Sequence, residues 1–392
     1  MRRLPWQVAS GIGVMPPVIR ALRSSRAFSS RRPERVQVPC GSAGHVSIDL
    51  FNSPGDSPQS ALLVHLPAFP SADEFTDGPA VRVPQFLEDL PVASINYRWR
   101  RNNGPVSLCW PTPIHDTAYA FAWLLENLAP LGNSKRDIYV YASHLGASLA
   151  TSLSLTETHA HARFGVRGLM AYNGIYNWTM FLPDHRINKP PKRAAAMATA
   201  PGLDEASHLH KLWEQMPALF DKPSNLFDPF ASPSLFFHGP GLLRPESFYM
   251  SINDAAMIDA LTADDDATSA PPKAPRKSRL IFPPRKSTLK LPPTLLLHDS
   301  SRQRPGPSKS TKGGQTKRRT KTTGHSLAAQ ARELAEMMRR SVSASELKDE
   351  AVVEDDEVHR RVRVVELGPE TDSIELSDAG QEIAREWLEE RM

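Results

Sequence analysis

The chain has 392 residues, of which 40% are hydrophobic and 23% charged, a composition that is ordinary for a globular protein. The formal net charge of +4 is small, but basic and acidic residues concentrate in separate stretches, so partners must be judged segment by segment. Two cysteines, Cys40 and Cys109, exclude a disulfide framework and a thiolate metal site, and no apolar run approaches the length of a membrane span.

The first 33 residues are basic and rich in serine, and the first acidic residue of the chain is Glu34. This composition is typical of a mitochondrial transit peptide, and Arg26 to Ser30 resembles a matrix-processing site. We therefore expect 1–33 to be a transit peptide that directs the protein to the mitochondrion, in the matrix. A disordered basic tail is the alternative.

Short strands are predicted from residue 36 onwards. The stretches 46–50, 61–65 and 92–98 are rich in hydrophobic residues and are separated by turn-forming residues. Nearly continuous hydrophobic runs are typical of parallel strands that are covered on both faces. The sequence therefore predicts an α/β fold with a mostly parallel sheet. A helix is predicted over 116–128, where Asp116 would lie near exposed N–H groups at the helix start.

The stretch 137–150 predicts a strand, a tight turn and a helix. Four strand-type residues, 138–141, lead into the turn Ala-Ser-His-Leu-Gly, and small or apolar residues follow from Ala147. Small residues at that place allow a helix to pack closely on a sheet.

The rest of the chain alternates further strands and helices with long inserted stretches. Further strands are predicted at 166–171, 294–298 and 361–367, and helices after Ser326 and Ser377. Three long stretches interrupt this pattern: a helix-containing region at 179–250, a flexible linker at 259–290, and a basic disordered insert at 302–323.

In this order the elements resemble the α/β-hydrolase fold, especially lipase and esterase relatives and their uncharacterised mitochondrial-type and fungal members. The stretch 137–150 resembles the nucleophile elbow, Gly-x-Ser-x-Gly, and Leu295 to Asp299 resembles the seventh strand with its catalytic acid. The resemblance covers 36–392. It implies a mostly parallel central sheet with helices on both faces and a cap insertion at 179–250.

The residues of the elbow depart from those of an active hydrolase. When Gly146 is aligned with the second glycine of the motif, His144 takes the place of the nucleophilic serine. Ser143 is one residue early and is the alternative nucleophile, while Asp299 fits the acid position. No histidine follows the last strand, where the resemblance places the general base, so His325 or a histidine of the cap region would have to replace it.

The loop His65 to Pro70, which the resemblance places after the third strand of the fold, is also altered. The resemblance implies an N–H donor for the oxyanion there, but Pro67 and Pro70 have no N–H group. Pairs of histidines at 159 and 161, and at 208 and 210, are not spaced as metal ligands on one helix face. We therefore expect no metal and no cofactor.

Our main expectation is a catalytically degenerate protein that binds an acyl-bearing or apolar ligand or acts as a scaffold. The first alternative is an active carboxylic-ester hydrolase that uses Ser143 with Asp299. The second alternative is an RNA- or ribosome-associated factor acting through the basic insert 302–323, which could equally meet anionic lipid.

Overall fold

The computed structural model describes 33–41, 44–52, 54, 60–70, 82–100, 108–188, 203–262, 273–301, 325–345 and 355–392. The chain divides into two compact units, Met1–Arg32 and Pro33–Met392, and all described residues belong to the second. The predicted transit peptide, apart from Pro33, and the predicted basic insert 302–323 lie outside the described residues.

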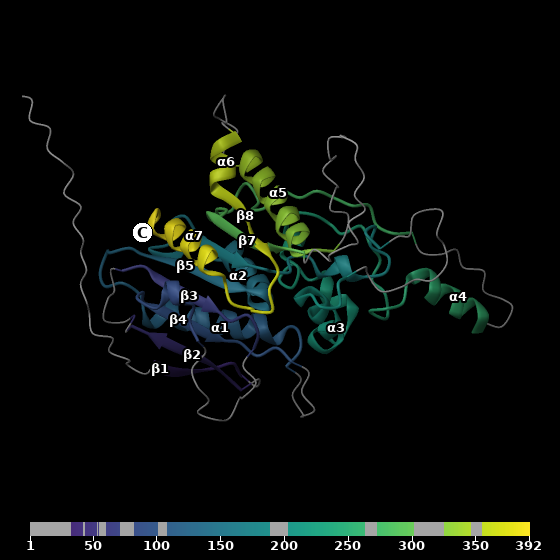
Figure 1. Ribbon diagram of the computed structural model, residues 1–392, viewed down its shortest axis with the longest axis horizontal. Coiled ribbons are helices and arrows are strands. Elements are labelled where there is room, and N and C mark those ends of the chain that lie inside the picture. The colour runs from purple at the N-terminus through teal and green to yellow at the C-terminus, as the bar shows by residue number, and fades with distance from the viewer. Residues whose placement is uncertain are drawn as a thin grey trace, which may run out of the picture. The chain divides into compact units, whose positions relative to one another are not determined.

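An eight-stranded sheet forms the centre of Pro33–Met392, with the strand order β1-β2-β4-β3-β5-β6-β7-β8 (Figure 1). Strand β2 is antiparallel to β1 and β4, and the remaining neighbours pair in parallel. The strands are β1 Glu34–Pro39, β2 His45–Phe51, β3 Leu62–Leu66, β4 Val92–Asn96, β5 Arg136–Ser143, β6 Phe164–Tyr172, β7 Thr294–Ser300 and β8 Val362–Pro369.

Helices cover both faces of this sheet, as the sequence predicts. Helices α1, α2 and α5 pack on one face, over a large hydrophobic core, whereas α7 and η2 lie together over a smaller core on the other face. The helices are α1 Thr112–Asn127, α2 His144–Thr156, α3 His208–Phe220, α4 Ile252–Thr262, α5 Leu327–Ser345, α6 Asp355–Arg361 and α7 Asp378–Glu389, with short 3-10 turns η2 Gln85–Leu87, η3 Trp178–Phe181, η4 Pro223–Phe227 and η5 Pro233–Phe236.

The parallel strands are buried because their hydrophobic runs are continuous. Every residue of β3 and β4 is buried, and a strand between two layers of helices needs apolar side chains in both directions. An antiparallel start followed by parallel strands in this order is the arrangement of α/β-hydrolases. The predicted fold is therefore confirmed.

The structure corrects the role expected for Asp116. Helix α1 begins at Thr112, so Asp116 lies one turn inside it, and its side chain is fully buried. Its carboxylate accepts hydrogen bonds from the backbone N–H of Arg98 at 2.9 Å and from the guanidinium of Arg98 at 2.6 and 2.9 Å. A buried carboxylate requires such a partner, which the sequence pattern could not reveal.

The residues between β6 and β7 include the predicted cap region 179–250. An aromatic cluster connects this region to the segment between β4 and α1. Its members are Trp99, Trp110, Trp178, Phe181 and Phe220. Two parts of the predicted linker 259–290 are described: 259–262 form the end of α4, and 273–290 hydrogen bonds back to the cap region through Leu280 N–H to Phe237 O and through Gly239 N–H to Ser278 O. None of the helices in the described ranges has the length and apolarity to cross a bilayer.

Candidate functional site

The turn between β5 and α2 has the backbone of a nucleophile elbow. His144, its first helical residue, has φ +47°, a left-handed conformation that is uncommon for residues other than glycine and in which asparagine, aspartate and histidine are enriched. A Cβ on Gly146 would lie 2.4 Å from Pro67 O and 2.7 Å from Leu66 O. Only glycine allows α2 to approach the end of β3 this closely, so the sharp turn depends on Gly146.

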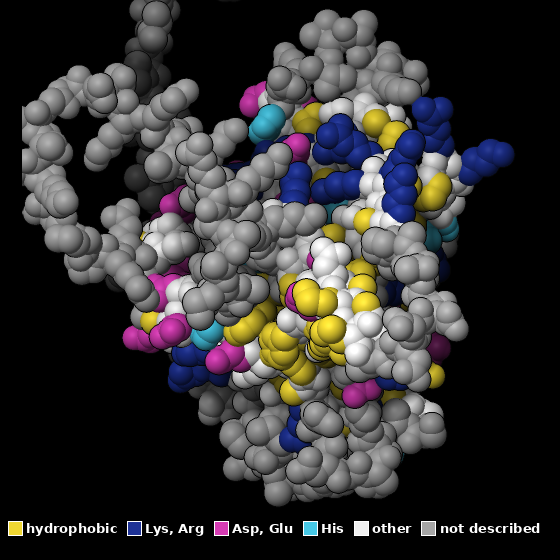
Figure 2. All heavy atoms as spheres, turned by 90° about the vertical axis from the view of Figure 1, so that its right-hand side faces the viewer, with side chains coloured by type: hydrophobic (Ala, Val, Ile, Leu, Met, Phe, Trp, Pro, Cys, Tyr) yellow, Lys and Arg dark blue, Asp and Glu magenta, His cyan; other side chains and the backbone are white. Residues whose placement is uncertain are grey.

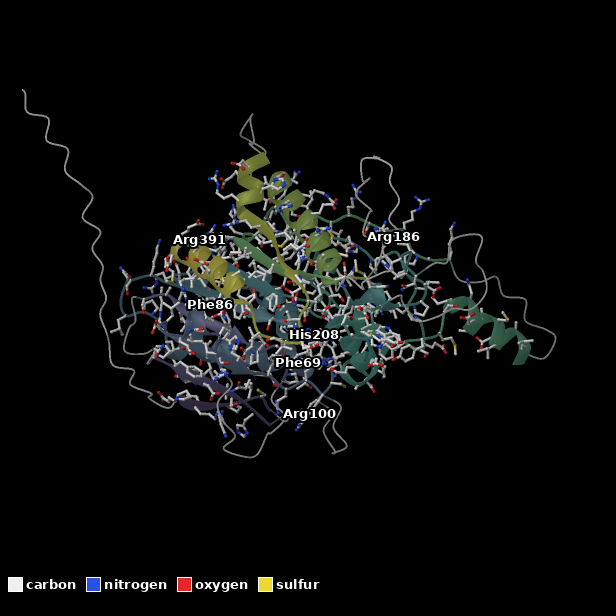
Figure 3. The ribbon with its side chains drawn as sticks, in the orientation of Figure 1. Phe69, Phe86, Arg100, Arg186, His208 and Arg391 are labelled. Carbon is white, nitrogen blue, oxygen red and sulfur yellow. The ribbon has the colours of Figure 1, made fainter. Side chains whose placement is uncertain are left out.

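His144 is fully buried and its ring nitrogens have no hydrogen-bond partner among the described residues. The ring contacts Phe69, Tyr172 and His208, with ring centroids 5.5, 5.7 and 5.3 Å away. Figure 3 labels Phe69 and His208, which lie near each other where the strand ends meet α3. Burial, and next the charge of His208, lower the pKa of His144 to about 3, so the imidazole is neutral near pH 7.

The N–H group that follows His144 is already bonded. Leu145 N–H donates to Ala68 O at 3.1 Å. In an elbow that acylates, the N–H of this residue is free to stabilise the oxyanion, together with a donor from the loop after β3. Here the loop after β3 contributes the carbonyl oxygen of Ala68 as an acceptor instead of an N–H donor. Pro67 and Pro70 of the same loop have no N–H group. The oxyanion site is therefore closed in this conformation.

Asp299 lies at the end of β7 in the predicted acid position, but its partners are not histidines. Its Oδ2 accepts hydrogen bonds from Tyr172 Oη at 2.7 Å and from Asn173 Nδ2 at 2.9 Å, and its backbone N–H donates to Asn173 Oδ1 at 2.9 Å. Burial, and then the hydrogen bond to Asp299, raise the pKa of Tyr172 well above its usual range. No imidazole among the described residues hydrogen bonds to this carboxylate. Asp299 therefore holds the ends of β6 and β7 together.

Ser143 lies on a different side of the turn from His144. Side chains alternate along a strand, so Ser143 projects from the same face of β5 as Tyr141. It borders a cleft of about 940 Å³ that Asp299 and Tyr172 also line, but that His144 does not reach. Ser143 and Asp299 thus meet in one cleft, whereas His144 is enclosed beside it.

The histidine that lines this cleft together with Ser143 is His65 of β3, which sequence reasoning missed. Its Nδ1 lies 3.1 Å from Ser94 Oγ, and its ring stacks on Tyr141 at 5.9 Å between centroids. Burial lowers the pKa of His65 to about 4. A general base works best with a pKa near the operating pH, so His65 is a weak base at pH 7. Its signal in the sequence was a single polar residue inside a hydrophobic strand.

His208 of the predicted cap region contacts His144 of the elbow. Glu370 lies after β8, at the position where the α/β-hydrolase resemblance places the catalytic histidine. Its Oε1 accepts a hydrogen bond from His208 N–H at 2.6 Å. The same oxygen lies 3.4 Å from His208 Nδ1, an ion-pair distance whose geometry does not make a hydrogen bond. Glu370 N–H in turn donates to Ser300 O at 2.9 Å. Glu370 thereby fixes the start of α3 over His144.

His325 does not complete this site. His325 Nε2 hydrogen bonds to Asn188 Oδ1 at 2.6 Å, and its ring stacks on Phe181, away from Ser143. Within the part of the chain that the structure describes, no three histidine, cysteine or acidic side chains are arranged to hold a metal ion. Of the candidate bases that the sequence left open, only a cap-region histidine, His208, contacts the elbow residue.

No protein-family model matches the chain, and no curated protein is similar to it in sequence. Several solved structures are similar to it, at TM-scores below 0.5. They include carboxyl esterase 2 of the mycorrhizal fungus Tuber melanosporum (TM-score 0.46, 11% identity, covering 93% of this chain and 87% of that one) and a hyperthermophilic esterase of the archaeon Pyrobaculum calidifontis (0.45, 14%, 91% and 81%). A hormone-sensitive lipase from a metagenome library is similar at 0.43, with 12% identity over 94% and 89%. TM-scores below 0.5 do not by themselves establish a common fold; the strand order of the sheet is that of α/β-hydrolases.

Proposed function

We propose that this protein binds an acyl-bearing or otherwise apolar ligand in its α/β-hydrolase cleft and does not hydrolyse esters at the elbow. The observation that supports this most directly is the closed elbow: His144 is buried without a hydrogen-bond partner, and Leu145 N–H is bonded to Ala68 O. Acyl transfer needs a nucleophile, a base and a free oxyanion donor within reach of one another. Use of the domain as a scaffold is compatible with the same geometry.

The cleft beside the elbow has the properties of a ligand site. Its volume of about 940 Å³ lies within the range of small-molecule pockets. Phe69, Val83 and Leu376 supply apolar surface, while Ser143 and Asp299 supply polar groups where the strands end. An extended apolar chain could lie against the apolar residues of the cleft while its polar group contacts Ser143 and Asp299.

Direct binding of a fluorescent fatty acid, used as the probe, would test this proposal. We expect the probe to bind the purified protein, and Thr371→Trp, at an exposed position of the cleft lining, to weaken binding roughly tenfold by occupying space. Gln215→Trp, an exposed position of α3, serves as the control and should bind like the wild type. Binding that is equal in both variants, or absent in the wild type, would contradict the proposal.

A carboxylic-ester hydrolase remains the second candidate, because Ser143, Asp299 and His65 line one cleft. The solved structures named above are described as esterases and a lipase, which makes hydrolysis the reaction to test. A fluorophosphonate probe that labels the wild type but not Ser143→Ala would establish this candidate and refute the main proposal. We expect no labelling. We also expect none in His144→Ser, since a restored hydroxyl would still lack a base and a free oxyanion donor.

We further propose that the protein is mitochondrial, on the basis of the basic, acid-free composition of 1–33. A fluorescent protein that carries 1–33 at its N-terminus should accumulate in mitochondria. Replacing the arginines of this segment by glutamines should leave the same fusion in the cytosol. A fusion with 1–33 that stays cytosolic would contradict this location.

A further inference from the structure

Asp299 differs from the other acidic side chains that are buried in the described part of the chain. Those others are Asp49, Asp116 and Glu370, and their basic neighbours are Arg35 at 2.7 Å, Arg98 at 2.6 Å and His208 at 3.4 Å. Asp299 is 7% exposed, and none of the described lysines, arginines or histidines forms an ion pair with it. Because burial removes the hydration of a carboxylate, a positive charge beside it is strongly favoured.

One oxygen of Asp299 is available for such a partner. Both hydrogen bonds to the carboxylate end on Oδ2, and their donors are the neutral side chains of Tyr172 and Asn173. Oδ1 has no hydrogen-bond partner among the described residues and is not enclosed, and Asp299 lines the cleft of about 940 Å³. A ligand in the cleft can therefore bind Oδ1 without breaking a contact of the protein.

Two hydroxyl groups without partners line the same cleft. Tyr141 and Ser143 are 2% and 6% exposed and lie on one face of β5, and no described residue hydrogen bonds to either hydroxyl. Ser143 pairs with Tyr172 in the register of β5 and β6, and Tyr172 donates to Asp299 from the next strand. Buried polar groups normally have partners. The cleft thus offers acceptors from neighbouring strands, and an ammonium group has three donors and no acceptor.

The described lining of the cleft is negatively charged. Glu88, Glu375 and Asp378 line it together with Asp299, against a single guanidinium, that of Arg82. Asp378 lies in the first turn of α7, where a carboxylate offsets the positive end of the helix. The excess negative charge therefore comes from Glu88, Glu375 and Asp299. This charge attracts a cationic head group and repels a carboxylate.

The positive charge of the protein lies elsewhere. The chain has a formal net charge of +4, and Figure 2 shows dark blue lysine and arginine side chains gathered in the upper half of the face that it views. Since Arg82 is the one cation among the described lining residues, these side chains belong to other parts of the surface. Nonspecific attraction to the protein would therefore favour an anionic ligand, which is the opposite of what the cleft favours.

We propose that the ligand of this cleft is a long-chain primary amine, whose ammonium group binds Asp299 Oδ1 and the hydroxyls of Tyr141 and Ser143. Its alkyl chain lies against the apolar residues of the cleft, such as Phe69 and Leu376. The inference rests on the proposed binding of an apolar ligand in the cleft, and it adds the chemistry of the head group.

Binding of three pyrene-labelled probes to the full chain near neutral pH tests the proposal. The probes are an alkyl amine, the alcohol and the fatty acid of the same chain length. We expect all three to bind, the amine about tenfold or more tighter than the fatty acid, and the alcohol between them, since a hydrogen bond between charged groups contributes about this factor. Methylating the amine to a trimethylammonium should weaken its binding, because no N–H donor remains.

Substitutions of single carboxylates locate the preference. Asp299→Asn keeps an oxygen for Tyr172 and Asn173 but removes the charge, so the amine should bind about tenfold more weakly and the alcohol almost unchanged. Glu375→Gln, at an exposed position, leaves the core intact and should weaken binding of the amine about threefold. Glu126→Gln removes an exposed carboxylate of α1, on the other face of the sheet, and should bind all three probes like the wild type.

The outcomes separate this inference from the proposed function. If none of the probes binds, the proposed ligand cleft itself is refuted. If the fatty acid binds as tightly as the amine, or if both Asp299→Asn and Glu375→Gln keep the full preference for the amine, the assigned head group is wrong while the cleft remains a binding site.

Discussion

Replacing His144 by phenylalanine should make the protein more stable, and increasingly so as the pH falls. The imidazole holds two buried nitrogens without partners among the described residues, and each such group costs about 1–3 kcal/mol. Phenylalanine keeps a planar ring and the same left-handed backbone, and its larger size costs about 1 kcal/mol in overpacking. Near neutral pH we therefore expect His144→Phe to raise the free energy of unfolding by about 1–5 kcal/mol.

Lowering the pH should increase the stability difference between His144→Phe and the wild type. The pKa of His144 is about 3 in the folded protein and 6.5 at its ordinary value, so between these limits the unfolded chain binds a proton that the folded chain does not. Stability is lost as the pH falls from 6.5 towards 3. At 1.36 kcal/mol for each pKa unit, the loss between neutral pH and about pH 5 is about 2 kcal/mol for this residue. His144→Phe removes that loss, while other buried histidines contribute equally to both proteins and cancel.

Urea denaturation of both proteins, at about pH 7.5 and about pH 5, measures these quantities. The stability difference should be positive at neutral pH and larger by about 2 kcal/mol in acid. His161→Phe, an exposed histidine, is the control and should change neither value. If His144→Phe destabilises the protein at neutral pH, or if the difference is independent of pH, His144 has a hydrogen-bond partner and the description of a closed elbow is wrong.

Three further substitutions test the other contacts of the site, the first two by urea denaturation and the third by hydrogen exchange. Gly146→Ala should cost about 3 kcal/mol, because its Cβ would meet Pro67 O, whereas Gly132→Ala, with open space around it, should cost about 1 kcal/mol; equal costs would contradict the close approach. Tyr172→Phe should cost about 1.5–3 kcal/mol by removing the buried hydrogen bond to Asp299, against a near-zero effect of the exposed Tyr249→Phe. Glu370→Ala should speed hydrogen exchange at the start of α3, since His208 N–H loses its acceptor; unchanged exchange, as expected for Glu382→Ala, would show that Glu370 does not hold that helix.

The fold was predictable because its information is local. Continuous hydrophobic runs marked β3, β4 and β7, and the small residues after His144 marked the helix that packs closely on the sheet. Helix α6, which the sequence analysis does not predict, changes no strand order, because it leads directly into β8. Order and type of elements follow from such patterns without knowledge of contacts.

The site was less predictable because its contacts join distant parts of the chain. His208 and Glu370 are 162 positions apart, and nothing near either residue indicates the other. The sequence predicted that Asp116 lies near a helix start, but in the structure its carboxylate accepts a hydrogen bond from Arg98, which no local pattern indicates. The hydrogen bond from Leu145 N–H to Ala68 O could not be predicted either, because it joins two backbone groups and does not depend on residue type.

That carbonyl limits what evolution or engineering could recover from this domain. Two base changes in the codon could place a serine at position 144, yet the bond from Leu145 N–H to Ala68 O would remain. Activity would first require the peptide group after Ala68 to rotate, so that its oxygen leaves and its nitrogen turns inward. A protein with this loop can therefore carry a serine in the right place for a long time without gaining an esterase.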